Sequence, residues 1–172
     1  MKSAKRYEIE IKLRVADLRE FARKLSREKA ERVRTVFEHN LLFDTPDNRM
    51  RSSGRLLRLR LEWPVERSGV PERPLSAAAR GILTYKGPTG RGAAREKASR
   101  YKVVEETEVE IPNPQELPGV LDRLGYRPTF QYEKRRTLYR LPGLRQLQVE
   151  LDETPIGNFV ELEGPRRAID RA

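Results

Sequence analysis

The stretch Tyr7-Glu8-Ile9-Glu10-Ile11-Lys12-Leu13-Arg14 alternates between apolar and charged side chains at every step. Successive side chains of a β-strand point to opposite faces, so this period of two gathers the apolar residues on one face. The other face carries only charges, in the order Glu8, Glu10, Lys12 and Arg14. The segment therefore predicts a half-buried strand, and its two neighbouring acids need a reason to be together because close like charges repel.

The same alternation recurs along most of the chain and predicts about eight strands, mostly antiparallel by the length of their connections. The predicted strands cover residues 7–14, 36–44, 55–62, 81–87, 103–111, 132–141, 146–152 and 159–163. Two long connections, over residues 64–80 and 87–100, separate some of them. Residues 44–48 and 52–54 are expected to form a turn and a loop.

Helices are few in this pattern. Asp17 and Glu20 have the spacing of a capping box at the start of a helix. A second, short helix is expected over residues 114–124, with Pro118 in its first turn or delaying its start and Gly125 after its end. The segment 166–172 has the pattern of a third helix that is just beginning.

Charges of one sign share a strand face repeatedly. The acidic pairs are Glu8/Glu10, Glu106/Glu108, Glu150/Asp152 and Glu161/Glu163, and the basic pairs are Arg58/Arg60 and Lys134/Arg136. A single such strand is ordinary, since antiparallel sheets often have one wet face. Repetition favours a closed barrel whose charged faces point inward, because an eight-stranded barrel has room for one small ligand. We therefore predict an α+β fold, mainly antiparallel β: an eight-stranded closed barrel with a polar, charged interior and a few peripheral helices over its apolar outside.

Composition narrows the classes of protein. The 172 residues are 37% hydrophobic and 36% charged, and the net charge of +10 favours anionic partners. Cys is absent, which excludes disulfides, thiolate metal sites and Cys nucleophiles. No apolar run approaches the ~20 residues of a membrane helix, and the first residues lack a signal-peptide pattern. We expect a cytoplasmic protein that does not enter a membrane.

The charged residues also indicate a type of chemistry. Carboxylate clusters without Cys suit hard cations such as Mg²⁺ or Mn²⁺. Arg offers bidentate forks to phosphate oxygens and Lys offers point charges. The only His, His39, is expected on a strand surface, so a His-ligated zinc site or a Ser-His-Asp triad has little support. The carboxylate clusters and the basic side chains together are the groups that chemistry on a phosphoryl group requires.

Several motifs, taken in order, resemble those of a known family, the CYTH superfamily or triphosphate tunnel metalloenzymes. That group includes class IV adenylate cyclases, thiamine triphosphatases and inorganic triphosphatases. The resemblance spans residues 6–165. It begins with the E-x-E-x-K signature at residues 8–12 and continues through motifs at 43–45, 57–60, 84–87, 106–108, 134–136, 151–152 and 159–164.

The resemblance implies a role for each matching residue. The metal side would comprise Glu8, Glu10, Asp152, Glu161 and Glu163. The phosphate side would comprise Lys12, Arg58, Arg60, Lys86, Lys134 and Arg136. Lys12 and Glu10 would also act in catalysis, while Glu106, Glu108 and Glu150 are acids of less defined role.

The chain departs from the family pattern in two places. Val104 stands where members often carry an Arg, two positions before Glu106. Members usually continue beyond Gly164 with a full helix and a tail that helps to close the tunnel, whereas this sequence ends at Ala172. We expect one CYTH-like domain over residues 1–172 that lacks this element or has been cut short.

The resemblance leads us to expect a divalent-metal-dependent enzyme that hydrolyses a triphosphate, either tripolyphosphate or an organic triphosphate such as thiamine triphosphate. A class IV adenylate cyclase acting on ATP is the alternative, and no separate purine-binding motif is visible. A nonenzymatic polyphosphate or nucleic-acid binding module is the rival from another class, but the acidic pairs would repel a nucleic-acid backbone. We expect no specific nucleic-acid partner, and the sequence is compatible with a homodimer.

Overall fold

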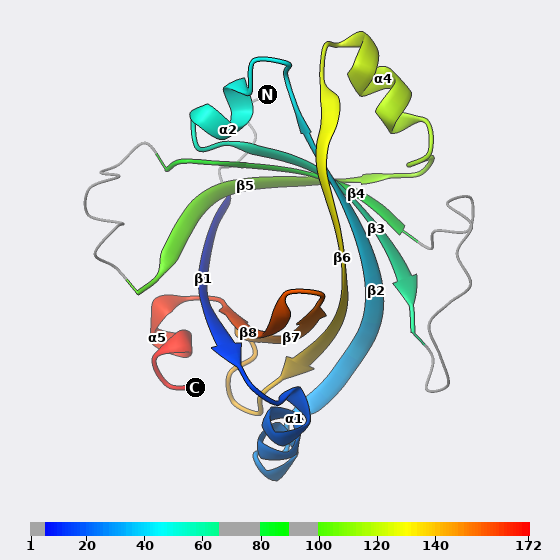
Figure 1. The fold of residues 1–172 in the computed structure, drawn as a ribbon. Coiled ribbons are helices and arrows are strands. Elements are labelled where there is room, and N and C mark those ends of the chain that lie inside the picture. The colour runs from blue at the N-terminus through cyan, green and yellow to red at the C-terminus, as the bar shows by residue number, and fades with distance from the viewer. Residues whose placement is uncertain (1–5, 66–79, 90–99) are drawn as a thin grey trace.

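The computed structural model describes residues 6–65, 80–89 and 100–172, in which eight strands form one closed antiparallel barrel (Figure 1). Around the ring the strands follow the order β1-β5-β4-β3-β2-β6-β7-β8, and β1 closes the ring by pairing with β5 and β8. The strands are β1 (Arg6–Val15), β2 (Glu31–Asp44), β3 (Leu56–Pro64), β4 (Arg80–Gly87), β5 (Lys102–Ile111), β6 (Arg127–Arg140), β7 (Gln148–Thr154) and β8 (Gly157–Glu163). The helices are α1 (Leu18–Arg27), α2 (Arg49–Ser52), α4 (Leu117–Arg123) and α5 (Arg166–Ile169). The predicted fold class is confirmed.

The apolar side chains lie mainly outside the barrel wall, as the alternation predicts. In one buried cluster, Leu25 of α1 and Ile169 of α5 pack against apolar residues of the last two strands. These are Leu147, which directly precedes β7, Val149 of β7 and Val160 of β8. The second cluster packs α4 onto β2 and β3; its buried residues are Phe37, Phe43, Leu59, Leu61, Trp63 and Leu121. The helices therefore cover the apolar outside, and the charged faces are left to line the interior.

Local sequence signals set the ends of the two longer helices. The carboxylate of Asp17 accepts a hydrogen bond from the backbone N–H of Arg19 at 2.7 Å, which caps α1. Glu20 makes an ion pair with Lys24 at 3.0 Å. Pro118 occupies the first turn of α4, and Gly125, with φ +85°, follows its end. Both helix predictions are confirmed, although α4 begins three residues later than expected.

Two features differ from the sequence prediction. Strands β2 and β6 each start about five residues earlier than predicted, because they pair with each other along almost their whole length. Residues 49–52 form the short helix α2 instead of a loop. The buried carboxylate of Asp44 accepts backbone hydrogen bonds from Thr45, Met50 and Arg51, and these contacts fold the segment back on β2.

The predicted long connections fall largely outside the described residues, which omit 66–79 and 90–99. Among the helices that the structure describes, none is long and apolar enough to cross a membrane.

Candidate active site

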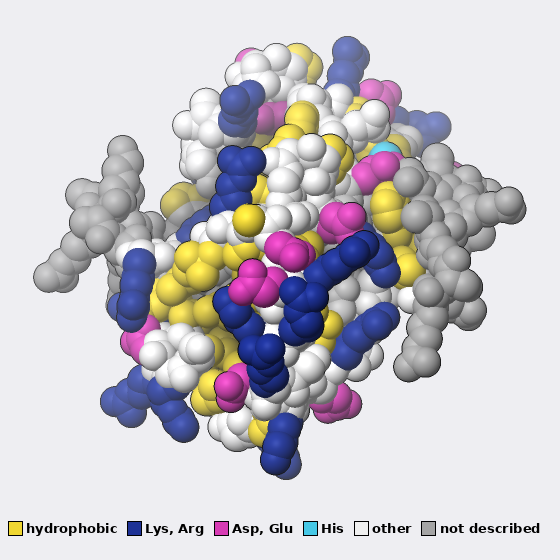
Figure 2. All heavy atoms as spheres, turned by 60° about the horizontal axis from the view of Figure 1, so that its bottom comes forward, with side chains coloured by type: hydrophobic (Ala, Val, Ile, Leu, Met, Phe, Trp, Pro, Cys, Tyr) yellow, Lys and Arg dark blue, Asp and Glu magenta, His cyan; other side chains and the backbone are white. Residues whose placement is uncertain are grey.

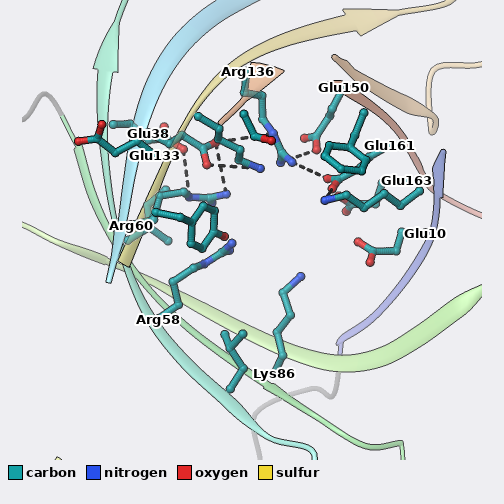
Figure 3. Close-up of a pocket in the computed structure, with 18 of the residues that line it drawn as sticks. Glu10, Glu38, Arg58, Arg60, Lys86, Glu133, Arg136, Glu150, Glu161 and Glu163 are labelled. Carbon is teal, nitrogen blue, oxygen red and sulfur yellow. Dashed lines mark hydrogen bonds and ion pairs between the residues drawn. The ribbon is translucent and has the colours of Figure 1, made fainter. Parts of the chain in front are cut away.

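A cavity of about 700 Å³ runs inside the barrel and is lined mostly by ionisable side chains. Its size lies within the range of small-molecule sites. Acidic and basic side chains gather side by side near the centre of the face in Figure 2. Figure 3 shows Arg58 and Arg60 on one side of the cavity and Glu10, Glu161 and Glu163 on the other. We call these two sides the basic wall and the acidic wall.

The basic wall is organised around Glu38 of β2, which is fully buried. Its carboxylate lies 3.5 Å from Lys134 Nζ, 3.7 Å from Arg136 Nε and 3.9 Å from Arg60 Nη1. Burial raises the pKa of Glu38, but Arg136, Lys134 and the arginines of β3 outweigh it and lower the pKa to about 2. Glu38 is therefore ionised at neutral pH and holds these cations close together.

Asp152 of β7 supports the same cations from behind. It is fully buried, accepts two hydrogen bonds from Arg136 at 2.7 and 2.6 Å, and accepts one from Lys134 Nζ at 2.9 Å. The Arg136 guanidinium also contacts Glu150 and Glu161, so it reaches from the basic wall to the acidic wall. Arg136 is thus held by carboxylates on several sides in a fixed orientation.

Arg58 of β3 is buried, and its hydrogen bonds are only partly satisfied. Its Nη2 lies 3.4 Å from Thr84 Oγ1, while its buried Nε has no hydrogen-bond partner among the described residues. Buried N–H donors without a partner are rare in proteins and costly. Arg60 Nη2 donates to Glu108 Oε1 at 3.1 Å. The side chain of Arg58 lines the cavity beside Arg60, so both guanidinium groups lie where an anion in the cavity could contact them.

The acidic wall follows from strand register. Glu10 of β1 lies opposite Glu163 of β8, and Glu161 lies opposite Glu150 of β7. Glu8 shares the inward face of β1 with Glu10 and is equally buried. Three neighbouring strands therefore bring five carboxylates to one region of the cavity.

These carboxylates divide into two groups by their pKa. Burial raises the pKa of Glu8 to about 7 in spite of Lys86, and burial raises that of Glu150 to about 7 in spite of Arg136. Burial, with Glu150 and Glu106 nearby, raises the pKa of Glu163 to about 7. The pKa values of Glu10 and Glu161 are lowered in spite of burial, by Lys102 for Glu10 and by Arg136 and Lys134 for Glu161. Burial is the largest cause of each raised pKa, so Glu8, Glu150 and Glu163 lose charge more readily than Glu10 and Glu161.

The acidic wall fits a divalent cation in donor type and charge. All its donors are carboxylate oxygens, which Mg²⁺ and Mn²⁺ prefer, and a bound cation would favour the ionised form of the acids whose pKa burial raises. Lysines form ion pairs with two of these acids: Lys102 Nζ lies 2.6 Å from Glu10, and Lys12 Nζ lies 2.7 Å from Glu161. Within the described ranges, no three acidic or His side chains converge as a metal site. Side chains would have to leave these ion pairs to bind a cation.

The structure brings together nearly all the site residues predicted from the sequence. The cavity is lined by Glu8, Glu10, Lys12, Arg58, Arg60, Lys86, Glu106, Glu108, Lys134, Arg136, Glu150, Glu161 and Glu163. Asp152 lies behind this surface, against Lys134 and Arg136. Lys86 contacts Glu8 and lies 3.1 Å from Glu106, so these two acids share one cation.

Sequence reasoning missed further inward residues: Glu38, Asn40, Glu62, Thr84, Lys102 and Tyr132. Glu62 follows Arg58 and Arg60 in the same alternation, and Tyr132 precedes Lys134 and Arg136 in theirs. The alternation therefore places both residues on the inward face, although the prediction considered only pairs of like charge. His39 points away from Glu38 along β2, and its Nδ1 lies 3.1 Å from Glu133, in keeping with the strand-surface prediction.

Comparison with known proteins points to one family. The sequence model described as the CYTH domain matches residues 6–170. No curated protein matches the chain in sequence.

Solved structures share the fold. A Vibrio parahaemolyticus protein proposed as an adenylate cyclase has a TM-score of 0.70 at 19% identity, over 96% of this chain and 81% of that one. A Pyrococcus horikoshii protein has a TM-score of 0.69 at 24% identity, over 95% and 82%. A Hippeastrum protein, proposed as an adenylyl cyclase and described as having a dominant triphosphatase activity, has a TM-score of 0.65 at 26% identity, over 95% and 81%.

Proposed function

Because this chain belongs to the CYTH-domain family, whose members process triphosphates, we propose that it is a divalent-metal-dependent triphosphate hydrolase. The observation that carries this proposal is the pairing of a basic wall and an acidic wall in one cavity of about 700 Å³. Such a cavity admits a small polyanion and excludes a nucleic-acid duplex. The two walls would bind its phosphates and its metal on opposite sides.

The basic wall would bind the phosphate chain. Arg58, Arg60 and Arg136 have planar guanidinium groups that match phosphate oxygens bidentately. Glu38 and Asp152 hold this wall in place. Two lysines complete the phosphate site, Lys86 and Lys134. Little side-chain rearrangement is then needed when the substrate enters, which favours binding.

Lys12 would stabilise the charge that develops on the departing phosphate. Burial lowers the pKa of Lys12, but Glu161 raises it above its ordinary value, so the side chain is cationic at neutral pH. Lys12 Nζ lies 2.7 Å from the carboxylate of Glu161, which is on the neighbouring strand β8. A cation fixed there lowers the barrier to breaking the phosphoanhydride bond.

The acidic wall would hold the metal through Glu8, Glu10, Glu161 and Glu163, with Asp152 in support. A divalent cation supplies Lewis-acid polarisation of phosphate oxygens when it is bound. Glu10 is ionised at neutral pH and can also accept a hydrogen bond from the attacking water. Water adds to the terminal phosphorus as the bond to the bridging oxygen breaks, giving orthophosphate and a shortened chain. Glu106, Glu108 and Glu150 would orient the cations of both walls.

The alternative is a class IV adenylate cyclase. The observation that favours the cyclase is a set of aromatic side chains in the cavity lining, against which a nucleotide base can stack: Phe130, Tyr132 and Phe159. Cyclisation also needs the ribose 3′-hydroxyl to be aligned with the α-phosphorus. Hydrolysis needs only a positioned water, which makes it the function we favour.

Product identification tests the proposal. The protein is incubated with tripolyphosphate, thiamine triphosphate or ATP plus Mg²⁺ or Mn²⁺, and products are identified by phosphorus NMR and chromatography. Orthophosphate and the matching diphosphate, lost on chelation, are expected; cyclic AMP and pyrophosphate from ATP would support the cyclase instead. Lys86→Met should abolish turnover, whereas Lys24→Met, on the exposed surface of α1, should not. If none of the three substrates is turned over, the proposal that the protein is an enzyme is refuted.

A further inference from the structure

Strand β5 brings a single cation to the cavity. Lys102 is the first residue of β5 and its only basic one, and it belongs to the cavity lining. In the strand register Lys102 lies opposite Glu10, and its Nζ donates a hydrogen bond to Glu10 Oε1 at 2.6 Å. The next residue on the same strand face, Val104, carries no charge. Lys102 is therefore a lone cation placed against one carboxylate of the proposed metal site.

Lys102 is held less firmly than the other two lysines that contact the acidic wall. Lys86 contacts two acids, and only 16% of its side chain is exposed. Lys12 contacts one acid, and its Nζ also lies 4.7 Å from the centre of the Phe159 ring. Lys102 makes one ion pair among the described residues, with Glu10, and 60% of its side chain is exposed. Exposed lysine–carboxylate pairs are weak, because a long flexible side chain must be ordered to form them, so Lys102 can leave Glu10 at little cost.

Glu10 lies between a cation on one neighbouring strand and an acid on the other. It pairs in register with Lys102 of β5 and with Glu163 of β8, and the carboxyl groups of Glu10 and Glu163 are neighbours in Figure 3. Like charges that face each other on adjacent strands repel. A positive charge beside Glu10 offsets this repulsion, and either the ammonium of Lys102 or a divalent cation can supply it.

Lys102 and a divalent cation compete for Glu10. The N–H donors of an ammonium and a metal ion both use the oxygen lone pairs of a carboxylate. Two cations held by one carboxylate also repel each other. Lys102 therefore leaves Glu10 when a divalent cation binds there. The released ammonium is a mobile point charge in the cavity lining, and phosphate oxygens are good acceptors for it.

We propose that Lys102 is an exchangeable counter-ion of the metal site: it pairs with Glu10 while no metal is bound, and it moves to a phosphate oxygen of the substrate when a divalent cation takes Glu10. This inference rests on the proposed function and adds to it a residue that couples the two ligands. Metal and triphosphate then bind cooperatively, since metal binding frees a cation for the phosphates. By linkage, triphosphate strengthens metal binding by the same factor.

Metal affinity in the absence of substrate tests the first half of the exchange. Binding of Mn²⁺ is followed by electron paramagnetic resonance of the free ion, so no turnover is involved. Lys102→Met removes the charge at nearly constant length and should bind Mn²⁺ about two- to fivefold more tightly, the worth of an exposed ion pair. Lys102→Arg keeps the charge and should bind Mn²⁺ as the wild type does. Lys24→Met removes an exposed lysine on α1 that pairs with Glu20, and it should leave Mn²⁺ affinity unchanged.

Triphosphate affinity tests the second half. Calorimetry is run with an imido-bridged analogue of tripolyphosphate, which resists hydrolysis, at saturating Mn²⁺ and again in excess chelator. At saturating Mn²⁺, Lys102→Met should bind the analogue about tenfold more weakly than the wild type, the size of one charge-assisted hydrogen bond. In chelator this loss should be about two- to fivefold smaller, because the Lys102 side chain of the wild type must first leave Glu10.

The outcomes separate this inference from the proposed function. If the wild type binds Mn²⁺ and Lys102→Met binds it equally or more weakly, the inference is wrong and the proposed function stands. A loss of analogue affinity in Lys102→Met that is the same with and without metal would also refute the exchange. If neither protein binds Mn²⁺, the metal assignment of the proposed function fails, and the inference fails with it.

Discussion

Glu38 offers the sharpest test of how the basic wall is held together. Glu38→Gln keeps the shape of the side chain and removes its charge, leaving Arg60, Lys134 and Arg136 around a neutral amide that brings its own N–H donors. The carboxylate has a pKa of about 2 in the folded protein against 4.5 for the ordinary group. At 1.36 kcal/mol per pKa unit, this difference is worth on the order of 3 kcal/mol of folding stability at neutral pH.

The sign of the pH dependence follows from the lowered pKa. Above pH 4.5 the carboxylate is ionised in both states, and its full contribution to stability is present. As pH falls from 4.5 through 2, the unfolded chain takes up the proton first and the contribution is lost. At pH 3 a contribution on the order of 1 kcal/mol should remain. The gap between wild type and Glu38→Gln should therefore shrink by about 2 kcal/mol from pH 7 to pH 3.

Urea denaturation at both pH values measures this gap. Glu31→Gln is the matched control, since Glu31 is an exposed acid on the same strand and should change stability by less than about 0.5 kcal/mol. Added tripolyphosphate should narrow the Glu38→Gln gap at pH 7, because it supplies negative charge to the same cations. A Glu38→Gln protein as stable as the wild type at pH 7, or a gap independent of pH, would refute the account of the basic wall.

Three further predictions concern the cavity. Glu10→Gln should lower triphosphate turnover in Mg²⁺ by orders of magnitude with an unchanged circular dichroism spectrum, while the exposed control Glu20→Gln should not; normal turnover by Glu10→Gln would contradict the metal assignment. Arg58→Lys and Arg60→Lys keep the charge but lose the bidentate fork, so each should weaken triphosphate binding in calorimetry, and wild-type affinity of the double variant would place these residues outside the phosphate site. Any DNA binding, followed by fluorescence anisotropy of a labelled duplex, should be weak, steeply reduced by salt and unaffected by excess triphosphate; tight, salt-resistant DNA binding without turnover would favour the binding module.

The sequence predicts much of this architecture because its alternation is strict. A period of two gives each strand an inside and an outside, and closure of the barrel then brings Glu10 to Glu163 without any further information. The same alternation places Arg58 with Arg60, and Lys134 with Arg136, on one strand face.

The sequence does not show how deeply a side chain is buried or which distant residues it contacts. Asp152 has the correct inward phase, but its position behind Lys134 and Arg136 depends on the register of β6 against β7. Glu38 has no acid two residues away on its strand face, and its role appears only when cations from two other strands surround it. Helix α2 depends on Asp44, which accepts hydrogen bonds from residues six and seven positions later, a contact that no short periodicity encodes.

The closure of the ring through β1 has a consequence for how the protein is made. The first strand to leave the ribosome pairs with β5, about a hundred residues later, and with β8, about a hundred and fifty residues later. Such separations in sequence slow folding, since a long loop must be ordered before the pairing is gained. Both edges of β1 remain open to other strands until β5 emerges, and the edge that pairs with β8 remains open until β8 emerges, so the nascent chain is exposed to aggregation during that time. Expression at low temperature, or with a chaperone that covers β1, should therefore raise the yield of folded protein.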